Sequence, residues 1–401
     1  MKPLLKYIIF LLLPVMMLGV LSTSCEKEEE TAVDSQNAAI HYIRSTDPAK
    51  SDSLIVGAFM GSLIAIVGDN LQDTKELWFN DQKATLNPTY ITKKTILVNV
   101  PNTVPAQVTN KMRLVFGDGH ELLYDFSVNV PAPSITSIKC EYVPTGGTAL
   151  LQGDFFFEPI KVIFPGDVQG ELVSVEKTQI AVTVPAGATS GPITIQTNFG
   201  KAKSGFYFRD NRNIILDYDT KLHETWTAPI AKPSDNPSPT PVDGGYAFFK
   251  HAADGAWMWT NELTMQYWAP RGRGKIPVAT GNINDLVFKF EANVMEWKDV
   301  RMEIFLAPYA EDHGRDAPTT AMARWQPWKE NGAYKTDGWV TVSIPLTEFK
   351  FGKDDPENEV NGSKKIENLA NLSNVTMMLF GPAAGTNPVY IAFDNIRIVP
   401  K

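Results

Sequence analysis

Residues 61–71 read GSLIAIVGDNL, and residues 146–156 repeat the pattern as GGTALLQGDFF. Each stretch is a short, mainly apolar run bounded by glycines and followed by aspartate, which is typical of a β-strand that runs into a turn. The match extends on both sides at a spacing of about 84 residues, which indicates an internal repeat. Three further pairs follow in the same order: LWF (77–79) with VIF (162–164), ILVNVP (96–101) with IAVTVP (180–185), and RLVFG (113–117) with QTNFG (196–200).

Two copies of one all-strand unit predict two small β-sandwiches in tandem. Pro131 and Pro133 lie between the copies and stiffen the joint, because each proline fixes its own backbone and restricts the residue before it. The apolar neighbours of Trp78 predict a core position for its side chain. The strand-like surroundings of Cys140 predict a small buried residue.

The rest of the chain is also strand-rich, but its unit is larger. About 190 residues with this spacing of strands fit one β-sandwich of jelly-roll type. The predicted fold is therefore all-β, with tandem immunoglobulin-like β-sandwiches followed by a larger jelly-roll-like β-sandwich. The predicted segments are a signal peptide at 1–24, an acidic tether at 25–38, two small sandwiches at 39–131 and 132–210, and the terminal sandwich at 211–401.

The N-terminus has the features of an export signal. Lys2 and Lys6 precede an apolar run over residues 7–21, which is shorter than the ~20 residues of a membrane-spanning helix. The sequence LSTSC (21–25) resembles the relaxed lipobox of Bacteroidetes lipoproteins, which implies a lipid on Cys25. A plain secretory signal with a chance cysteine is the alternative. The following EKEEE (26–30) is similar to the acidic tag of lipoproteins displayed on the outer face of the outer membrane.

Eight of the nine tryptophans lie after residue 211. Because a Trp ring is costly to expose to water, such a group is either core or a platform for a flat, partly apolar ligand. For an exported protein a sugar is a natural ligand of this kind, since the axial C–H face of a pyranose lies well against an indole face. The lead hypothesis is capture of a polysaccharide.

Strand alternation sorts these aromatic residues. In LVFKFEANV (286–294) the even positions face the core, so Lys289 and Glu291 face outward, and a straight continuation puts Trp297 on the ligand side. Trp268 and Trp328 stand where strands give way to loops, so we expect them to meet ligand. The predicted carbohydrate-binding residues are Trp257, Trp259, Tyr267, Trp268, Trp297 and Trp328, with Trp257 and Trp259 open between core and platform.

The remaining tryptophans of this module are expected to be structural or are left open, and polar residues are candidates for contacts with sugar hydroxyls. Trp325 is predicted in the core, Trp339 at a structural sandwich edge, and Trp226 is open. Sugar hydroxyls need polar partners, because an unpaired buried hydroxyl costs ~1–3 kcal/mol. The candidates, each of which can also be an ordinary surface side chain, are Asn261, Glu262, Gln266, Lys298, Arg324 and Lys329.

Two family resemblances rest on specific stretches. Residues 36–208 resemble IPT/TIG immunoglobulin-like domains through the Gly68-to-Leu71 turn and the strands that end in Val-Pro at 100–101 and 184–185. The chain as a whole, with TDGWVTVSIPLTEF (336–349) and FDNIRI (393–398), resembles Bacteroidetes surface glycan-binding proteins with a C-terminal xyloglucan-binding-like domain. The resemblance implies a non-catalytic protein that binds a β-glucan, xyloglucan or mannan beside a SusC/SusD-like transporter.

Other functions find little support in the sequence. The net charge of −8 and the lack of a basic stripe argue against nucleic acid as a partner. No Glu-x-Asp-x-x-Glu spacing supplies the paired carboxyls of a sandwich glycosidase, and the five histidines are scattered, so neither an enzyme nor a cofactor is predicted. Asp217 with Asp394 and Asn395 could hold a structural Ca²⁺ or simply cap turns. An adhesin or assembly protein that uses its Trp residues as a protein-binding hot spot is the alternative class.

Overall fold

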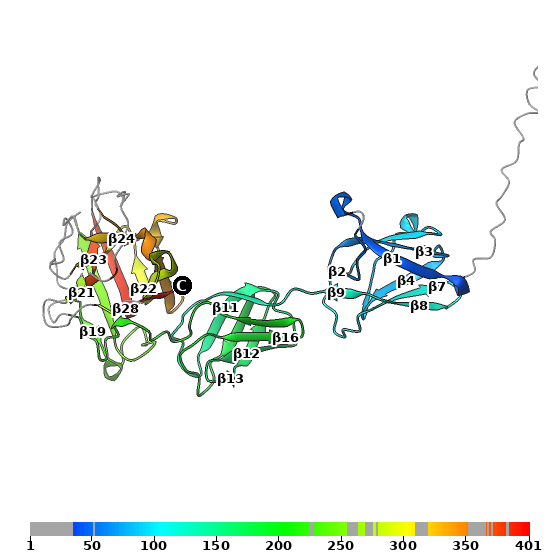
Figure 1. Cartoon of the computed structure of the whole chain (residues 1–401). Helices are drawn as coiled ribbons and strands as arrows, with labels where there is room; N and C mark the ends of the chain where they lie inside the picture. The colour runs from blue at the N-terminus through cyan, green and yellow to red at the C-terminus, as the bar shows by residue number, and fades with distance from the viewer. Residues whose placement is uncertain are drawn as a thin grey trace, which may run out of the picture. The chain divides into compact units, whose positions relative to one another are not determined.

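The computed structural model describes residues 35–401, apart from 51–52, 224–227, 255–263, 269–275, 278–279, 309–319, 352–365, 367–368, 370–371 and 382–384. Every element in these residues is a β-strand or a short 3₁₀ turn, so the predicted all-β fold is confirmed (Figure 1). No helix among them has the length and apolar character to cross a membrane. Cys25, the acidic tether up to residue 34, Trp226, Trp257 and Trp259 lie outside the described residues.

The chain divides into two compact units, Met1–Val130 and Pro131–Lys401. The first is a sandwich whose core includes Phe79, Phe116 and Phe126. One sheet has the order β1-β3-β6 and the other β5-β4-β7-β8, while β2 and β9 form a separate parallel pair. The strands are β1 Ala39–Ser45, β2 Gly57–Phe59, β3 Leu63–Asp69, β4 Thr74–Phe79, β5 Gln82–Lys83, β6 Thr95–Asn99, β7 Lys111–Phe116, β8 Glu121–Asp125 and β9 Ser127–Asn129.

The second unit begins with a sandwich of the same kind, with sheets β10-β11-β15-β14 and β13-β12-β16-β17. Cys140 is buried in its core at 4% exposure, as predicted, and burial raises the pKa of its thiol. The strands are β10 Ser134–Ile138, β11 Thr148–Asp154, β12 Ile160–Phe164, β13 Val168–Gln169, β14 Glu171–Val175, β15 Gln179–Thr183, β16 Thr194–Thr197 and β17 Gly200–Lys203.

The repeated stretch has one structural role in both copies. A Cβ on Gly68 would lie 2.0 Å from the carbonyl oxygen of Ala39, and one on Gly153 would lie 1.9 Å from that of Ser134. Glycine is therefore required where the first strand of each sandwich crosses closely over the next one. Both first strands also shift register at the same place, between Ile40 and Tyr42 in β1 and between Ile135 and Ser137 in β10.

Trp78 is not a core residue, so that prediction is wrong. It alternates with the buried Leu77 and Phe79 in β4 and lies half-buried on the opposite face of the sheet. There the guanidinium of Arg113 lies 5.2 Å from the ring centroid, and the indole N–H donates to Glu76 at 2.9 Å. A cationic neighbour over the ring and a hydrogen bond at its edge let Trp pack on a solvated face.

The terminal domain is a two-layer sandwich. One sheet has the order β19-β20-β28-β22-β25, with β18 also paired to β28, and the facing sheet has the order β21-β27-β23-β24-β26. The main core lies between them and includes Phe249, Phe288, Phe290 and Phe393. The strands are β18 Ile214–Leu216, β19 Ile230–Ala231, β20 Tyr246–Asp254, β21 Thr264–Trp268, β22 Leu286–Trp297, β23 Arg301–Pro308, β24 Ala321–Trp325, β25 Val340–Pro345, β26 Lys350–Phe351, β27 Leu372–Phe380 and β28 Thr386–Pro400.

The odd positions 289, 291 and 293 of β22 point away from the domain core, as predicted, but they are buried rather than solvated. Lys289, Glu291 and Asn293 are 4%, 0% and 7% exposed. The second sandwich contributes Glu141 to this face, and its carboxylate accepts from Lys289 Nζ at 2.6 Å and from Arg397 Nη2 at 2.6 Å. The polar side of this sheet is thus the buried interface to the neighbouring sandwich. Alternation alone cannot distinguish such an interface from a solvated side.

This interface holds two positive and two negative side chains. Arg397, which is 0% exposed, also donates to both carboxylate oxygens of Glu291, at 2.8 and 3.1 Å. Burial by itself would lower the pKa of Arg397, but Glu291 and Glu141 outweigh it and raise the pKa. Glu141, Lys289, Glu291 and Arg397, called the interdomain ion network below, lock the two sandwiches of the second unit together.

Candidate functional site

Trp297 is a core residue, so its predicted place on the ligand face is wrong. The pairing of β22 with β28 shifts between Val294 and Glu296. This β-bulge turns the following residues to the other face of the sheet, so Trp297 enters the core at 1% exposure. Its ring lies 5.0 Å from that of Trp325, and its indole N–H donates to the carbonyl oxygen of Val300 at 2.6 Å.

Trp325 and Trp328 continue this aromatic cluster toward the surface. Trp325 packs against the core, with its ring 5.2 Å from that of Phe290. Trp328 lies in the 3₁₀ turn Pro327–Lys329 and is half-buried, and its N–H donates to the same Val300 oxygen at 2.9 Å. One carbonyl therefore anchors two indoles, and Trp328 keeps only part of its ring for a ligand.

Tyr267 and Trp268 lie in β21, the edge strand of the five-stranded sheet. Their backbone positions are described, whereas their side chains lie outside the described part of the structure. In the register with β27, Tyr267 stands opposite Val375 and Trp268 opposite Asn374. Directly opposed positions of antiparallel neighbours share a face. Because Val375 belongs to the core, position 267 is on the core side of the sheet and position 268 is on its outer side.

The outer side of this sheet combines apolar and charged groups. Phe305, Met322, Met378 and Phe380 form a small apolar cluster there. Beside it, Arg324 donates to Glu303 Oε1 from Nη2 at 2.9 Å and from Nε at 3.1 Å. These six residues, called the outer face below, place a polarisable apolar cluster beside a fixed ion pair. All of them are packed: Glu303 and the four apolar residues are at most 5% exposed, and the Arg324 side chain is 7% exposed.

Only one residue of the Glu303–Arg324 pair was predicted from the sequence. Arg324 was predicted as a candidate for sugar hydroxyls, but Glu303 was not singled out. Its signal is present in RMEIFL (301–306), where Met302, Ile304 and Leu306 fall on one face and Glu303 falls on the other, between Arg301 and Phe305. Its exposure of 0% and its register opposite Arg324 show that the pair is built into the sheet.

Asp217 caps a turn, which was one of the two roles left open for it. Its carboxylate accepts from the backbone N–H groups of Asp219, Thr220 and Lys221 and from the Thr220 hydroxyl, at 2.6 to 3.1 Å. Among the residues that the structure describes, no group of three His, Cys, Asp or Glu side chains is arranged to hold a metal ion.

Asp394 gives the domain a distinct response to pH. It is 0% exposed, and burial raises the pKa of its carboxyl well above the usual value, with Glu291 adding to the shift. The folded state then keeps a proton that the unfolded chain releases above a pKa of about 3.9. We expect stability to fall as pH rises from there toward the pKa of the folded state.

The variant Asp394→Asn tests this expectation. It removes the titration and keeps the shape, so its free energy of unfolding should exceed that of the parent at pH 7 by more than about 1 kcal/mol. The difference should vanish near pH 4. Urea denaturation followed by Trp fluorescence at several pH values measures it, and a difference that stays constant with pH would contradict the assignment.

Comparisons with known proteins agree with this architecture. Residues 208–400 match the family described as "Surface glycan-binding protein B xyloglucan binding domain". The solved surface glycan-binding protein PbSGBP-B from Prevotella bryantii is 25% identical, with a TM-score of 0.68 over 90% of this chain and 98% of that one. The SGBP-B from a complex xyloglucan utilization locus of Bacteroides uniformis is 18% identical and shares the fold, with a TM-score of 0.51 over 90% of this chain and 99% of that one.

A curated relative is an "IPT/TIG domain-containing protein" of Bacteroides ovatus. It is 29% identical over 213 residues, which is 50% of this chain and 39% of that protein, so the match spans well under half of the relative's length. The chain is thus similar to the type B surface glycan-binding proteins, both in its terminal domain and in its tandem β-sandwich fold. The similar proteins that carry a functional name are glycan-binding proteins rather than enzymes.

Proposed function

We propose that this SGBP-B-like chain is a non-catalytic lipoprotein that captures a β-linked polysaccharide at the cell surface. The supporting observation is the match of its terminal sandwich to a xyloglucan-binding domain of surface glycan-binding proteins. Xyloglucan is therefore the first polysaccharide to test, and mixed-linkage β-glucan and glucomannan come next, because their chains present similar apolar faces. A lipid on Cys25 would hold the protein in the outer membrane beside a SusC/SusD-like transporter, which takes up the captured glycan.

The proposed binding surface is centred on β21, the edge strand of the sheet whose outer side carries the buried outer face. Trp268 is its principal aromatic residue, because its backbone position is on the outer side of the sheet, opposite Asn374. The ion pair of Arg324 with Glu303 supports this side with fixed charges. Trp257 and Trp259 stay predicted contacts, whereas Tyr267 is left out because its position is on the core side of the sheet. Trp328 contributes the exposed part of its ring.

Such a surface binds by stacking and by hydroxyl contacts, with modest energy per sugar unit. A ligand that crosses several such positions gains affinity by simultaneous engagement, which favours a polymer over a free monosaccharide. Capture without cleavage suits a protein that passes its ligand to a transporter.

The variant Trp268→Ala tests the binding surface. We expect at least a tenfold loss of affinity, equivalent to about 1.4 kcal/mol, because the principal stacking ring is removed. Affinity electrophoresis of the mature protein in gels that contain xyloglucan, mixed-linkage β-glucan or glucomannan measures the loss as reduced retardation. Trp78→Ala is the matched control, since Trp78 is a half-buried Trp of the first unit and should leave retardation unchanged.

Three outcomes would contradict the proposal in different ways. Unchanged retardation of Trp268→Ala would remove the assigned surface but leave the function. Release of reducing sugar by the parent protein would show an enzyme. Failure of every polysaccharide to retard the parent protein would favour the alternative of an adhesin or assembly protein.

A further inference from the structure

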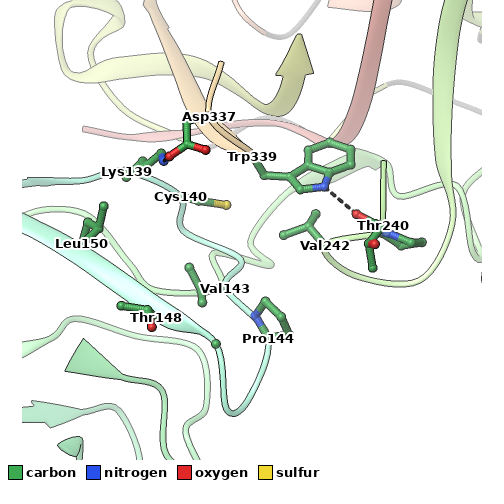
Figure 2. A pocket seen from close by; sticks show the side chains of 12 residues that line it. Lys139, Cys140, Val143, Pro144, Thr148, Leu150, Thr240, Val242, Asp337 and Trp339 are labelled. Carbon is green, nitrogen blue, oxygen red and sulfur yellow. Dashed lines mark hydrogen bonds and ion pairs between the residues drawn. The ribbon is translucent and has the colours of Figure 1, made fainter. Parts of the chain in front are cut away.

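The second unit contains a pocket between its two sandwiches (Figure 2), and no residue of the outer face lines it. Its volume is about 340 Å³, at the lower end of the ~300–1,000 Å³ of small-molecule sites. Leu150 and Thr148 line it from β11 of the second sandwich, and Val242 and Trp339 line it from the terminal domain. Figure 2 shows Lys139 and Asp337 together at one end, with Trp339 and Val242 along one side.

Trp339 is held rigidly at this pocket. Its indole N–H donates to the carbonyl oxygen of Thr240 at 2.8 Å, and its ring meets that of Tyr246 edge-on at 5.5 Å and 71°. The side chain is half-buried and packs against residues of both sandwiches, in agreement with the structural role predicted for it. A ring fixed by two contacts loses little entropy when a ligand stacks on it.

Lys139 and Asp337 give the pocket an adjacent donor and acceptor. The Lys139 ammonium lies 3.3 Å from Asp337 Oδ2, and the two side chains are 33% and 106% exposed. An ion pair so open to water contributes at most about 1 kcal/mol, so both groups can exchange their water for ligand hydroxyls. The pair leaves the pocket without net charge among its lining side chains, which favours a neutral ligand.

We propose that this pocket is a second carbohydrate site, which takes a chain end or a side branch of one or two sugar rings. Trp339 offers its ring to the C–H face of the sugar. Lys139 donates to one hydroxyl and Asp337 accepts from its neighbour. The proposal rests on the proposed glycan-binding function for its ligand class, but it uses neither β21 nor the outer face, so the two sites can be tested apart.

The experiment uses the full mature chain labelled with 5-fluorotryptophan. The ¹⁹F resonance of Trp339 is identified as the signal that is missing from Trp339→Phe. Cellobiose and β-1,4-mannobiose are the probes, and we expect at least one of them to shift this resonance in a saturable way. The shift should persist in Trp268→Ala, even though retardation of that variant by polysaccharide should be reduced.

Two variants of β11 show whether the shift arises in the pocket. Thr148→Phe fills the space from an exposed position and should abolish the shift. Gln152→Phe places the same side chain at another exposed position of that strand, which does not line the pocket, and should leave it intact. Asp337→Ala should lower the affinity for the disaccharide probe at least fivefold. It should not change the fold, since the Asp337 side chain is fully exposed.

A Trp339 resonance that neither probe moves overturns the second site, even if polysaccharide still retards the protein. A shift that survives Thr148→Phe overturns it too, because the sugar then binds elsewhere. A saturable shift without retardation by any polysaccharide supports the pocket and counts against the proposed polymer surface alone.

Discussion

Replacing Arg397 with methionine is expected to lower the free energy of unfolding by about 3–5 kcal/mol. Arg397 is fully buried and donates to both Glu141 and Glu291. The methionine fills much of the space of the arginine stem, but it leaves two buried carboxylates with Lys289 as the remaining cation of the network. The loss comes chiefly from uncompensated buried charge, which costs more than the intact network contributes.

Urea denaturation of the full chain, followed by Trp fluorescence, measures this effect. Eight of the nine tryptophans lie after residue 211, so the signal reports mainly on the terminal domain. Lys139→Met is the matched control, because it breaks the more exposed pair with Asp337 in the same unit and should cost less than about 1 kcal/mol. Adding Glu141→Gln to Arg397→Met should cost less than the sum of the single changes. An Arg397→Met variant as stable as the parent would show that the interdomain ion network does not stabilise the fold.

Replacing Trp297 with alanine is expected to destabilise the terminal domain by about 3–5 kcal/mol, because the change opens a large cavity in the core. Trp297 is 1% exposed and packs against Trp325. It also holds one of the two N–H bonds to Val300, the other being that of Trp328. The folded variant should still bind polysaccharide.

Two measurements on Trp297→Ala are compared: its free energy of unfolding, and its retardation by polysaccharide at a temperature where the variant is still folded. Trp297→Phe, which retains most of the apolar volume, should lose less stability than the alanine variant and bind as the parent does. Lost retardation together with unchanged stability would mean that Trp297 contacts the ligand, as strand alternation alone had predicted.

The contrast between Trp297 and the strand before it shows what the sequence could predict. The even positions of residues 286–294 face the core as alternation requires, because two-residue periodicity is a direct consequence of strand geometry. The bulge after Val294 could not be predicted, since a single inserted position leaves no mark in the hydrophobic pattern. One irregular pair therefore reversed the assignment of the most strongly favoured residue.

Lys289 and Glu291 show a different limit. Their alternation was predicted correctly, but their surroundings were not, because the groups that cover them lie far away in the sequence. Glu141 and Arg397 are 256 residues apart, belong to different sandwiches and meet only where these two sandwiches pack together. The repeated glycines, in contrast, were visible from the sequence because each copy meets the same local steric demand.

The interdomain ion network also bears on how the binding domain can be moved between proteins. A cut near residue 208, where the family match begins, leaves Arg397 and Lys289 facing water with Glu291 alone. The severed piece would carry one surplus positive charge at this surface and would expose side chains that are buried in the whole chain. A fusion of the terminal domain to another protein should therefore include the second sandwich as well, so that the two sandwiches are transferred together.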